Sequence, residues 1–337
     1  MKKKFNIMLC TLIGVLSACN EYDFDQEQYR NEVGLLSNSS LIYDRQVANV
    51  GQEKDTIYLV ATVSGSQISP NTHHVALLES DSLLKAYNKS NFDIEKEKFA
   101  KLLPDECYDF PNKELDIQAG TSKVMFPIYL KNLERISPDS IYFLDYKIDP
   151  EKTPNYNPDK SHVLLRIYKE NYYATTKTST YYNYTSSTIV IPNPSGSPEV
   201  RRPTNANQVF PIGANSVRMM AGDEDLGDYK TARSRIVSKS IILEIGEQQP
   251  ENPQARELTI RAHDRVNEVD PVDVVQLTPI DDYDNTFLLN AIRTPDGRAT
   301  YYKEFRLHYK YRLESTAPYR EVKAKLRYEF NPRVDNL

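Results

Sequence analysis

The chain has 337 residues and a formal net charge of −5, and it contains 24 Tyr but no Trp. This length is enough for two domains of ordinary size, and the composition excludes a disordered or collagen-like chain. A net negative surface has no electrostatic attraction to nucleic acid, so no nucleic-acid partner is expected.

The first residues have the pattern of a secretory signal peptide. Lys2, Lys3 and Lys4 precede an uncharged apolar stretch over residues 5–15, as in the charged and apolar regions of such signals. The stretch is too short for a transmembrane helix, which needs roughly 20 apolar residues. We therefore predict that residues 1–18 are removed. Because this segment contains three Lys and no acidic residue, the mature chain would have a net charge of −8.

The sequence Leu16-Ser17-Ala18-Cys19 resembles the lipobox of bacterial lipoproteins. In those proteins the cysteine sulfur carries a diacylglyceryl group and the signal is cut directly before it. The resemblance therefore implies that Cys19 is the lipidated first residue of the mature chain. Several acyl chains on one residue hold firmly, since each buried methylene contributes about 0.8 kcal/mol. The alternative is an ordinary signal peptide with a cysteine in its cleavage region.

Acidic residues follow this cysteine. Glu21, Asp23 and Asp25 resemble the export signal of Bacteroidetes lipoproteins that are displayed on the outer face of the outer membrane. The resemblance implies a protein that is anchored in the outer membrane by lipid and faces the cell exterior. Residues 19–35 are polar and have no regular period, so we predict an acidic, lipidated tether.

Alternating apolar and polar residues predict β-strands in the first half of the chain. The predicted strands are residues 56–63, 123–130, 140–148 and 162–168. Between the first two, Ser80-Asp81-Ser82 can cap a helix that begins at Leu83, and Asp93 can cap a second helix that ends at Pro104. We therefore predict a β-sandwich of immunoglobulin-like type over residues 36–172, with a short helical insert.

A second set of strands follows the Tyr-, Thr- and Ser-rich segment 171–187. The predicted strands are residues 188–191, 240–245, 257–262, 272–277, 286–292, 304–313 and 320–330. In the segment 304–313 every second residue is apolar, as expected for an antiparallel strand with one buried face. His308 lies on the opposite, polar face, where we expect it to contact solvent. We predict an antiparallel β-barrel or sandwich over residues 173–337 that ends in a β-meander.

Little in the sequence indicates catalysis or metal binding. The five His residues lack the spacing of a zinc site, and the motifs of nucleophilic hydrolases and nucleotide-binding proteins are absent. Asp223, Asp225 and Asp228 could supply oxygen ligands to calcium, but their spacing differs from that of an EF-hand. Cys107 is expected to be a small core residue. We therefore expect no catalytic residue, no bound metal and no cofactor, while a site assembled from distant residues stays open.

Tyr side chains are the candidates for binding a sugar, because aromatic rings stack on the apolar faces of pyranose rings and Trp is absent. A Tyr ring can bury its apolar body and leave its hydroxyl in water. Most Tyr residues of a β-rich chain pack on sheets, so packing is the alternative role of each candidate. The exposed-looking candidates are Tyr172, Tyr173, Tyr181, Tyr182, Tyr184, Tyr301 and Tyr302, and we select Tyr181, Tyr182, Tyr184, Tyr301 and Tyr302 as predicted glycan-binding residues.

Two longer segments carry a family resemblance. The insert from "LLKAYN" to "LLPDECYDF", the following "IQAG" and the closing "YFLDYKI" resemble the Bacteroidetes N-terminal domain family catalogued as domain of unknown function 1735. The later "YDNTF" and "FRLHYKYRL" segments are similar to its partner family, catalogued as domain of unknown function 4361. Together the two resemblances cover nearly the whole mature chain, and neither implies a catalytic site.

Proteins of this architecture are similar to the auxiliary surface lipoproteins of polysaccharide-utilisation loci, related in role to those of the starch-utilisation system. The resemblance implies that the chain holds a poly- or oligosaccharide near a TonB-dependent transporter for uptake, without cleaving it. The alternative is a structural or adhesive surface lipoprotein. Such a protein would bind a partner such as a transporter or a fimbrial component through a sheet edge.

Overall fold

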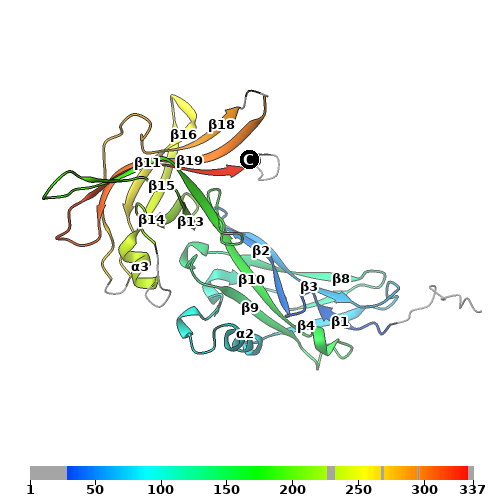
Figure 1. Ribbon diagram of the computed structural model, residues 1–337. Coiled ribbons are helices and arrows are strands. Elements are labelled where there is room, and N and C mark those ends of the chain that lie inside the picture. The colour runs from blue at the N-terminus through cyan, green and yellow to red at the C-terminus, as the bar shows by residue number, and fades with distance from the viewer. Residues whose placement is uncertain (1–28, 226–231, 267–268, 294, 296, 333–337) are drawn as a thin grey trace, which may run out of the picture.

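The computed structural model describes residues 29–225, 232–266, 269–293, 295 and 297–332. The predicted signal peptide, residues 1–18, and the predicted lipidation site Cys19 lie outside the described residues. The described chain is mainly β, as predicted, and forms two domains that meet at an angle (Figure 1). Within this part of the chain, no helix is both long enough and apolar enough to cross a membrane.

The N-terminal domain is a sandwich of two β-sheets. One sheet has the order β1-β3-β8-β6, and the other has the order β2-β10-β9-β4-β7 with β5 paired to β9. Paired strands are antiparallel except β10 with β2 and β5 with β9. The strands are β1 (Val33–Leu35), β2 (Ile42–Asn49), β3 (Asp55–Val63), β4 (His73–Glu79), β5 (Lys101–Leu102), β6 (Tyr108–Asp109), β7 (Glu114–Ile117), β8 (Lys123–Leu130), β9 (Tyr142–Ile148) and β10 (His162–Glu170).

Every second side chain of β3 and β8 points into the space between the two sheets. Ile57 and Leu59 of β3 and Phe126 and Ile128 of β8 are buried there, and burial of such side chains contributes about 1.5–3 kcal/mol each. Cys107 lies in the same core, fully buried as predicted, and burial raises the pKa of its thiol.

The predicted tether ends earlier than residue 35. Val33 and Leu35 form β1 with Gly34 between them, and both side chains are only 1% exposed. β1 pairs with β3, so its backbone groups are hydrogen-bonded within the four-stranded sheet. The two apolar residues therefore belong to the core of the sandwich, although the polar residues around them hide this in the sequence.

The helical insert contains one α-helix, α2 (Ser82–Phe92), which confirms the first predicted helix. Asp81 occupies the N-cap position, but its side chain makes no capping hydrogen bond. Instead, the carboxylate of Asp145 on β9 accepts hydrogen bonds from the backbone N–H groups of Leu83 and Leu84, at 3.1 and 3.0 Å. These N–H groups have no partner within the helix. A residue distant in sequence thus fixes the start of the helix.

The second predicted helix is wrong. In its place the chain forms the 3-10 turn η1 (Lys96–Lys98) and then the short strand β5. Ala100 and Leu103 are buried, but charged residues separate the other apolar positions, and the segment lacks the wide apolar stripe of a packed helix. The remaining 3-10 turns of this domain are η2 (Asp105–Cys107), η3 (Leu133–Arg135) and η4 (Pro158–Lys160).

The C-terminal domain is a closed antiparallel barrel of eight strands, ordered β11-β13-β14-β15-β16-β18-β19-β20, in which β20 pairs again with β11. Closure removes the free edges of the sheet, and β18, β19 and β20 form the predicted terminal meander. The short helix α3 (Ala232–Lys239) connects β14 to β15. The strands are β11 (Thr180–Ile191), β12 (Glu199–Arg201), β13 (Ala206–Gly213), β14 (Ser216–Met220), β15 (Ser240–Gln249), β16 (Asn252–Ala262), β17 (Asp273–Gln276), β18 (Thr286–Arg293), β19 (Ala299–Arg312) and β20 (Arg320–Phe330).

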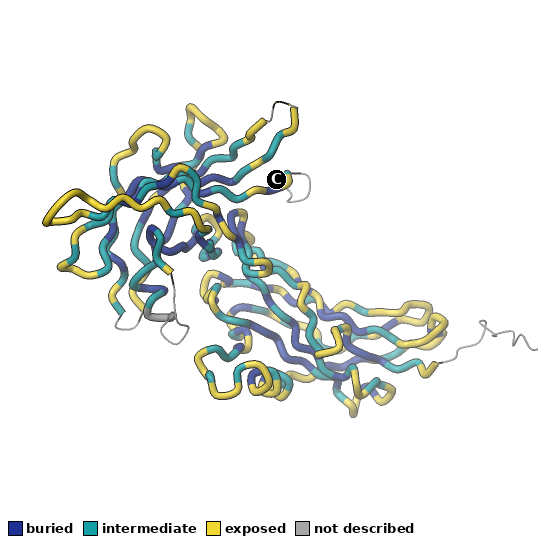
Figure 2. Tube along the Cα trace, viewed as in Figure 1, coloured by how far each residue is buried: buried dark blue, intermediate teal, exposed yellow. Residues whose placement is uncertain are grey.

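Each domain has its own buried core, as Figure 2 shows. Phe305, Leu307, Tyr309 and Tyr311 of β19 fill the barrel in the alternation that the sequence predicts. The prediction for His308 is wrong, because this side chain is only 8% exposed. Its Nδ1 lies 2.6 Å from the backbone oxygen of Thr278, and its Nε2 lies 3.0 Å from a carboxylate oxygen of Glu321. Protein groups therefore replace the expected solvent.

Hydrogen bonds around Gly222 close one end of the barrel. The Gly222 N–H donates to the Tyr309 hydroxyl at 2.7 Å, and the Tyr184 hydroxyl donates to the Gly222 carbonyl. Next to them, the Tyr311 hydroxyl donates to the Glu224 carboxylate at 3.3 Å, and Arg320 donates to the same carboxylate oxygen at 2.6 Å. Polar groups that the barrel buries at this end are thus satisfied by one another.

The chain passes from one domain to the other where β10 leads into β11 (Figure 1). Polar contacts lie beside this connection. The Arg218 guanidinium of β14 makes two hydrogen bonds to the carboxylate of Asp139 in the N-terminal domain, at 2.5 and 2.6 Å. The Asn171 side-chain amide donates to the backbone oxygens of Gly213 and Ser216, at 2.8 and 3.0 Å. Near this contact but within the N-terminal domain, the Lys169 ammonium of β10 donates to the Ile136 carbonyl at 2.9 Å.

We expect Lys169 to make stability depend on pH. Its side chain is 3% exposed, and burial lowers its pKa from 10.5 to about 8. Between pH 8 and pH 10 this side chain therefore binds more protons in the unfolded chain than in the folded chain, so its contribution to the free energy of unfolding should rise with pH by roughly 2 kcal/mol. Urea denaturation across this range should show the free energy of unfolding of the wild-type chain rising by this amount relative to that of Lys169→Met, because the Cys107 thiol, whose pKa burial raises, is present in both chains. A wild-type curve parallel to that of the variant would contradict the prediction.

Candidate functional site

The outer surface of the four-stranded sheet carries large apolar side chains that face solvent. Tyr58 on β3 and Met125 and Tyr129 on β8 are 38%, 42% and 38% exposed. They alternate with the buried residues of the same strands and therefore point to the opposite face of the sheet. Exposed apolar side chains that gather on one face, rather than occurring singly, indicate a binding surface.

The strand register brings these side chains together. Tyr58 of β3 pairs with Pro127 of β8. The pair Thr56 and Tyr129 lies two residues further along both strands. Tyr58 and Tyr129 are therefore diagonal neighbours on one face, at a distance that long side chains can bridge. Met125 follows on the same side of β8, beyond Pro127. We call Tyr58, Met125, Pro127 and Tyr129 the tyrosine face.

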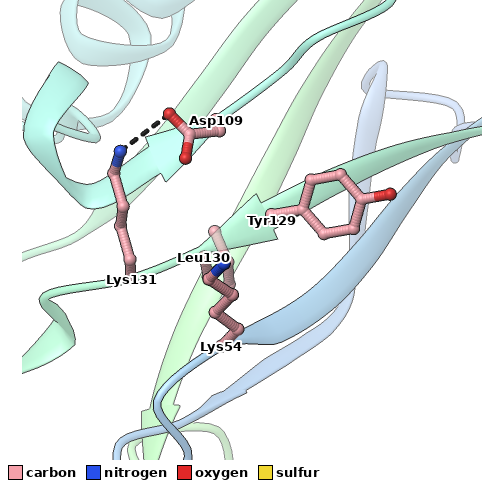
Figure 3. Close-up of a pocket in the computed structure, with 5 residues that line it drawn as sticks. All are labelled: Lys54, Asp109, Tyr129, Leu130 and Lys131. Atoms are coloured by element: carbon pink, nitrogen blue, oxygen red, sulfur yellow. Dashed lines mark hydrogen bonds and ion pairs between the residues drawn. The ribbon is translucent and has the colours of Figure 1, made fainter.

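A shallow pocket of about 160 Å³ lies at the end of the tyrosine face. Figure 3 shows the Tyr129 ring on one side of Leu130 and the side chains of Asp109 and Lys131 on the other. Asp109 lies on β6 directly opposite Tyr129, and its carboxylate accepts a hydrogen bond of 2.7 Å from the Lys131 ammonium. Lys54, just before β3, completes the lining.

This combination suits a ligand with both apolar and hydroxyl-bearing faces. Aromatic rings offer flat apolar area with a polar edge, and the charged side chains of Lys54, Asp109 and Lys131 can donate to or accept from hydroxyl groups. Among the described residues that line the pocket, Asp109 is the only carboxylate. Glycoside hydrolysis by the usual mechanism needs two carboxyl groups about 5–9.5 Å apart, so the pocket lining provides half of that pair.

Two of the tyrosines selected from sequence are in the barrel interior. Tyr182 is fully buried, and its hydroxyl donates to the Tyr173 carbonyl at 2.9 Å. Tyr184 packs against the barrel core and binds the Gly222 carbonyl, as described above. The expectation that these two side chains are exposed is wrong, because the segment 180–187 forms β11 of the closed barrel and every second side chain points inward.

The other selected tyrosines lie at the surface of the barrel but do not form one group. Tyr181 is 50% exposed on the outside of β11. Tyr301 is 38% exposed and lies beside the Phe330 ring, with 6.2 Å between ring centroids. Tyr302 points to the opposite side of β19 and lies near the Arg327 guanidinium. Tyr172, another exposed-looking candidate, is 37% exposed and packs edge-on against Phe287.

The acidic segment considered for calcium is occupied by ion pairs where it is described. Asp223 lies 3.5 Å from Arg201, and Glu224 pairs with Lys239 at 2.7 Å. Asp228 lies outside the described residues. Across the part of the chain that the structure describes, no group of three or more His, Cys, Asp or Glu side chains is arranged to hold a metal ion.

Comparison with known families follows the division into two domains. A family model described as an N-terminal domain matches residues 29–155, and a companion model described as a C-terminal domain matches residues 161–327. Together they match most of the chain. The chain therefore has both of the domains that these models describe. No curated protein matches the chain in sequence.

Solved structures from Bacteroides share the fold of this chain. A Bacteroides ovatus protein of unknown function is 16% identical, covers 94% of this chain and 97% of its own, and has a TM-score of 0.61. A Bacteroides ovatus multidomain protein that includes domain of unknown function 1735 is 17% identical, with coverages of 92% and 98% and a TM-score of 0.63. An auxiliary nutrient-binding protein of Bacteroides thetaiotaomicron is 18% identical, with coverages of 86% and 89% and a TM-score of 0.57. The chain is thus a two-domain protein with the fold of these Bacteroides proteins.

Proposed function

We propose that this protein binds a poly- or oligosaccharide through the tyrosine face, without cleaving it. The observation that carries the proposal is the pair of exposed rings, Tyr58 and Tyr129, on adjacent strands next to Asp109 and Lys131. The face is open rather than enclosed, which suits sugar units inside a long chain as well as chain ends. A Bacteroides protein of the same fold is described as an auxiliary nutrient-binding protein, and this agrees with such a role.

The proposal includes a lipid anchor at Cys19 and a position on the outer face of the outer membrane. Its support is the lipobox-like sequence and the acidic residues behind it. From Cys19 to the first strand at Val33 a fully extended chain reaches at most about 50 Å, so the sandwich and its tyrosine face would stay near the membrane and within reach of a transporter. Loss of membrane fractionation in Cys19→Ala would support this part, and unchanged fractionation would contradict it.

The alternative, capture of a protein partner by strand addition, is less well supported. Beyond its pairing with β6 at Tyr129 and Leu130, the outer edge of β8 is the open edge of the four-stranded sheet. Pro127 removes one backbone donor from this edge and Lys123 places a charge at its start. Both features disfavour pairing with another strand.

The test is affinity electrophoresis of the soluble chain that starts at Asn20. The gels would contain amylopectin, xylan, galactomannan, yeast mannan, homogalacturonan or chondroitin sulfate, and reducing ends would be assayed in the same mixtures. We expect retardation by at least one of these polymers and no release of sugar. Retardation by none would favour the protein-partner alternative, and steady release of reducing ends would favour a hydrolase.

Substitution of Tyr129 by alanine tests whether the tyrosine face is the surface that binds the polysaccharide. Loss of one stacked ring should weaken binding of the retarding polysaccharide about tenfold, since such a ring contributes roughly 1–1.5 kcal/mol. Tyr181→Ala is the matched control, because this ring is also exposed, 50% against 38% for Tyr129, but lies on the barrel. Equal losses in both variants, or a loss only in Tyr181→Ala, would contradict the assignment to the tyrosine face.

A further inference from the structure

A second pocket lies between the helical insert and the start of β9, on the side of the sandwich that meets the barrel. Its volume is about 200 Å³, and its walls include Phe92, Phe99, Glu97, Asp139 and Ser140. This is smaller than the roughly 300–1,000 Å³ of typical sites for drug-sized ligands. The space therefore suits a small ligand or a single unit of a longer one.

The apolar wall of this pocket is held in place by the insert. The α2 helix ends at Phe92, and Asp93 adopts a left-handed backbone conformation with φ of 49°, which reverses the chain. The Asn88 side chain then makes two hydrogen bonds to the backbone of Ala100, at 2.8 and 2.9 Å. The Phe92 and Phe99 rings lie 6.5 Å apart with their planes tilted by 32°, and both line the pocket.

The polar wall is fixed from the other domain. Two hydrogen bonds from Arg218 hold the carboxylate of Asp139, whose side chain is 22% exposed and so keeps part of its surface available. The neighbouring Ser140 hydroxyl accepts a hydrogen bond from Lys101 at 3.1 Å. A partly exposed carboxylate and an oriented hydroxyl can bind ligand hydroxyl groups. The Arg218 guanidinium is 1% exposed and comes from the barrel, so the polar wall depends on contact between the domains.

We propose that this pocket is a second carbohydrate-binding site, which takes one sugar unit between the Phe92 and Phe99 rings and the Asp139–Ser140 wall. The proposal rests on the proposed function and extends it to a second site. Because Arg218 positions Asp139, binding of sugar here and docking of the two domains favour each other, as linkage requires. Two sites on one chain would also strengthen attachment to a polysaccharide through a high effective concentration.

The test uses the soluble chain from Asn20 and oligosaccharides cut from the polysaccharide that retards it, measured by isothermal titration calorimetry. We expect two binding events in the wild-type chain, of which Tyr129→Ala weakens one about tenfold and Phe99→Ala weakens the other by a similar factor. Phe99→Leu, which keeps apolar volume and removes the ring, should weaken the second event about fivefold and guards against loss of folding. Ile94→Ala is the matched control, because Ile94 is 83% exposed on the same insert and does not line the pocket.

Arg218→Met tests the link between the two domains. This variant should weaken the event that depends on Phe99 and leave the event that depends on Tyr129 unchanged. A single event that Tyr129→Ala weakens and Phe99→Leu leaves unchanged would overturn the second site while the proposed function stands. Absence of binding to every polysaccharide would overturn both.

Discussion

Replacement of Gly222 by alanine should lower the free energy of unfolding of the barrel by about 2–4 kcal/mol. Gly222 has φ of +52°, and a Cβ atom there would lie 2.7 Å from the Tyr311 hydroxyl and 2.9 Å from the Tyr311 ring. Tyr311 cannot move aside easily, because its ring is fully buried and Glu224 and Arg320 lie against its hydroxyl. Urea denaturation of the variant and the wild-type chain, followed by tyrosine fluorescence, measures the difference.

Gly120→Ala separates the two causes of this loss, which are the positive φ of the backbone and the close contact with Tyr311. Gly120 also has a positive φ, +78°, but no atom lies within 4 Å of the position that its Cβ would take. This variant therefore reports the backbone cost alone, about 1 kcal/mol. Equal losses in Gly120→Ala and Gly222→Ala would contradict close packing against Tyr311.

Strands with regular alternation could be predicted from the sequence. The segment 123–130 coincides with β8, and the charged and apolar alternation of β19 and β20 predicted the terminal meander. The same alternation could have identified the tyrosine face, because Tyr58 lies between Ile57 and Leu59, and Tyr129 between Ile128 and Leu130, in the phase that must point outward. The predicted strands therefore contained the pattern that marks Tyr58 and Tyr129 as outward-facing. The tyrosines selected from the sequence lie instead in segments whose composition resembles that of loops.

Other features depend on contacts that no local pattern contains. β11 begins in a segment rich in Thr, Ser and Tyr, and it is a strand because β13 and β20 pair with it. The α2 helix starts where Asp145, some 60 residues away in the chain, meets its first turn. Such residues are polar in sequence and buried in structure, so hydropathy places them on the surface.

Asp139→Ala should destabilise the contact between the domains more than Arg218→Met does, although both variants remove the same ion pair. Asp139→Ala leaves the Arg218 guanidinium without its carboxylate in a site where it is 1% exposed and stacked on the Phe210 ring at 4.2 Å. Removal of one partner from a buried pair typically costs about 3–5 kcal/mol. In Arg218→Met the remaining carboxylate is already 22% exposed and can regain water, so we expect a loss of about 1–2 kcal/mol.

Differential scanning calorimetry distinguishes these outcomes. In Asp139→Ala the barrel can relieve its buried charge by separating from the sandwich, so the two domains should unfold in separate transitions. Arg218→Met and the double variant should resemble each other and stay closer to the wild-type chain, because neither contains a buried, unpaired guanidinium. A double-mutant cycle measures the coupling between the two side chains. If Arg218→Met proves the more damaging substitution, Asp139 is the group that depends on its partner, and Arg218 must then have other support within the barrel.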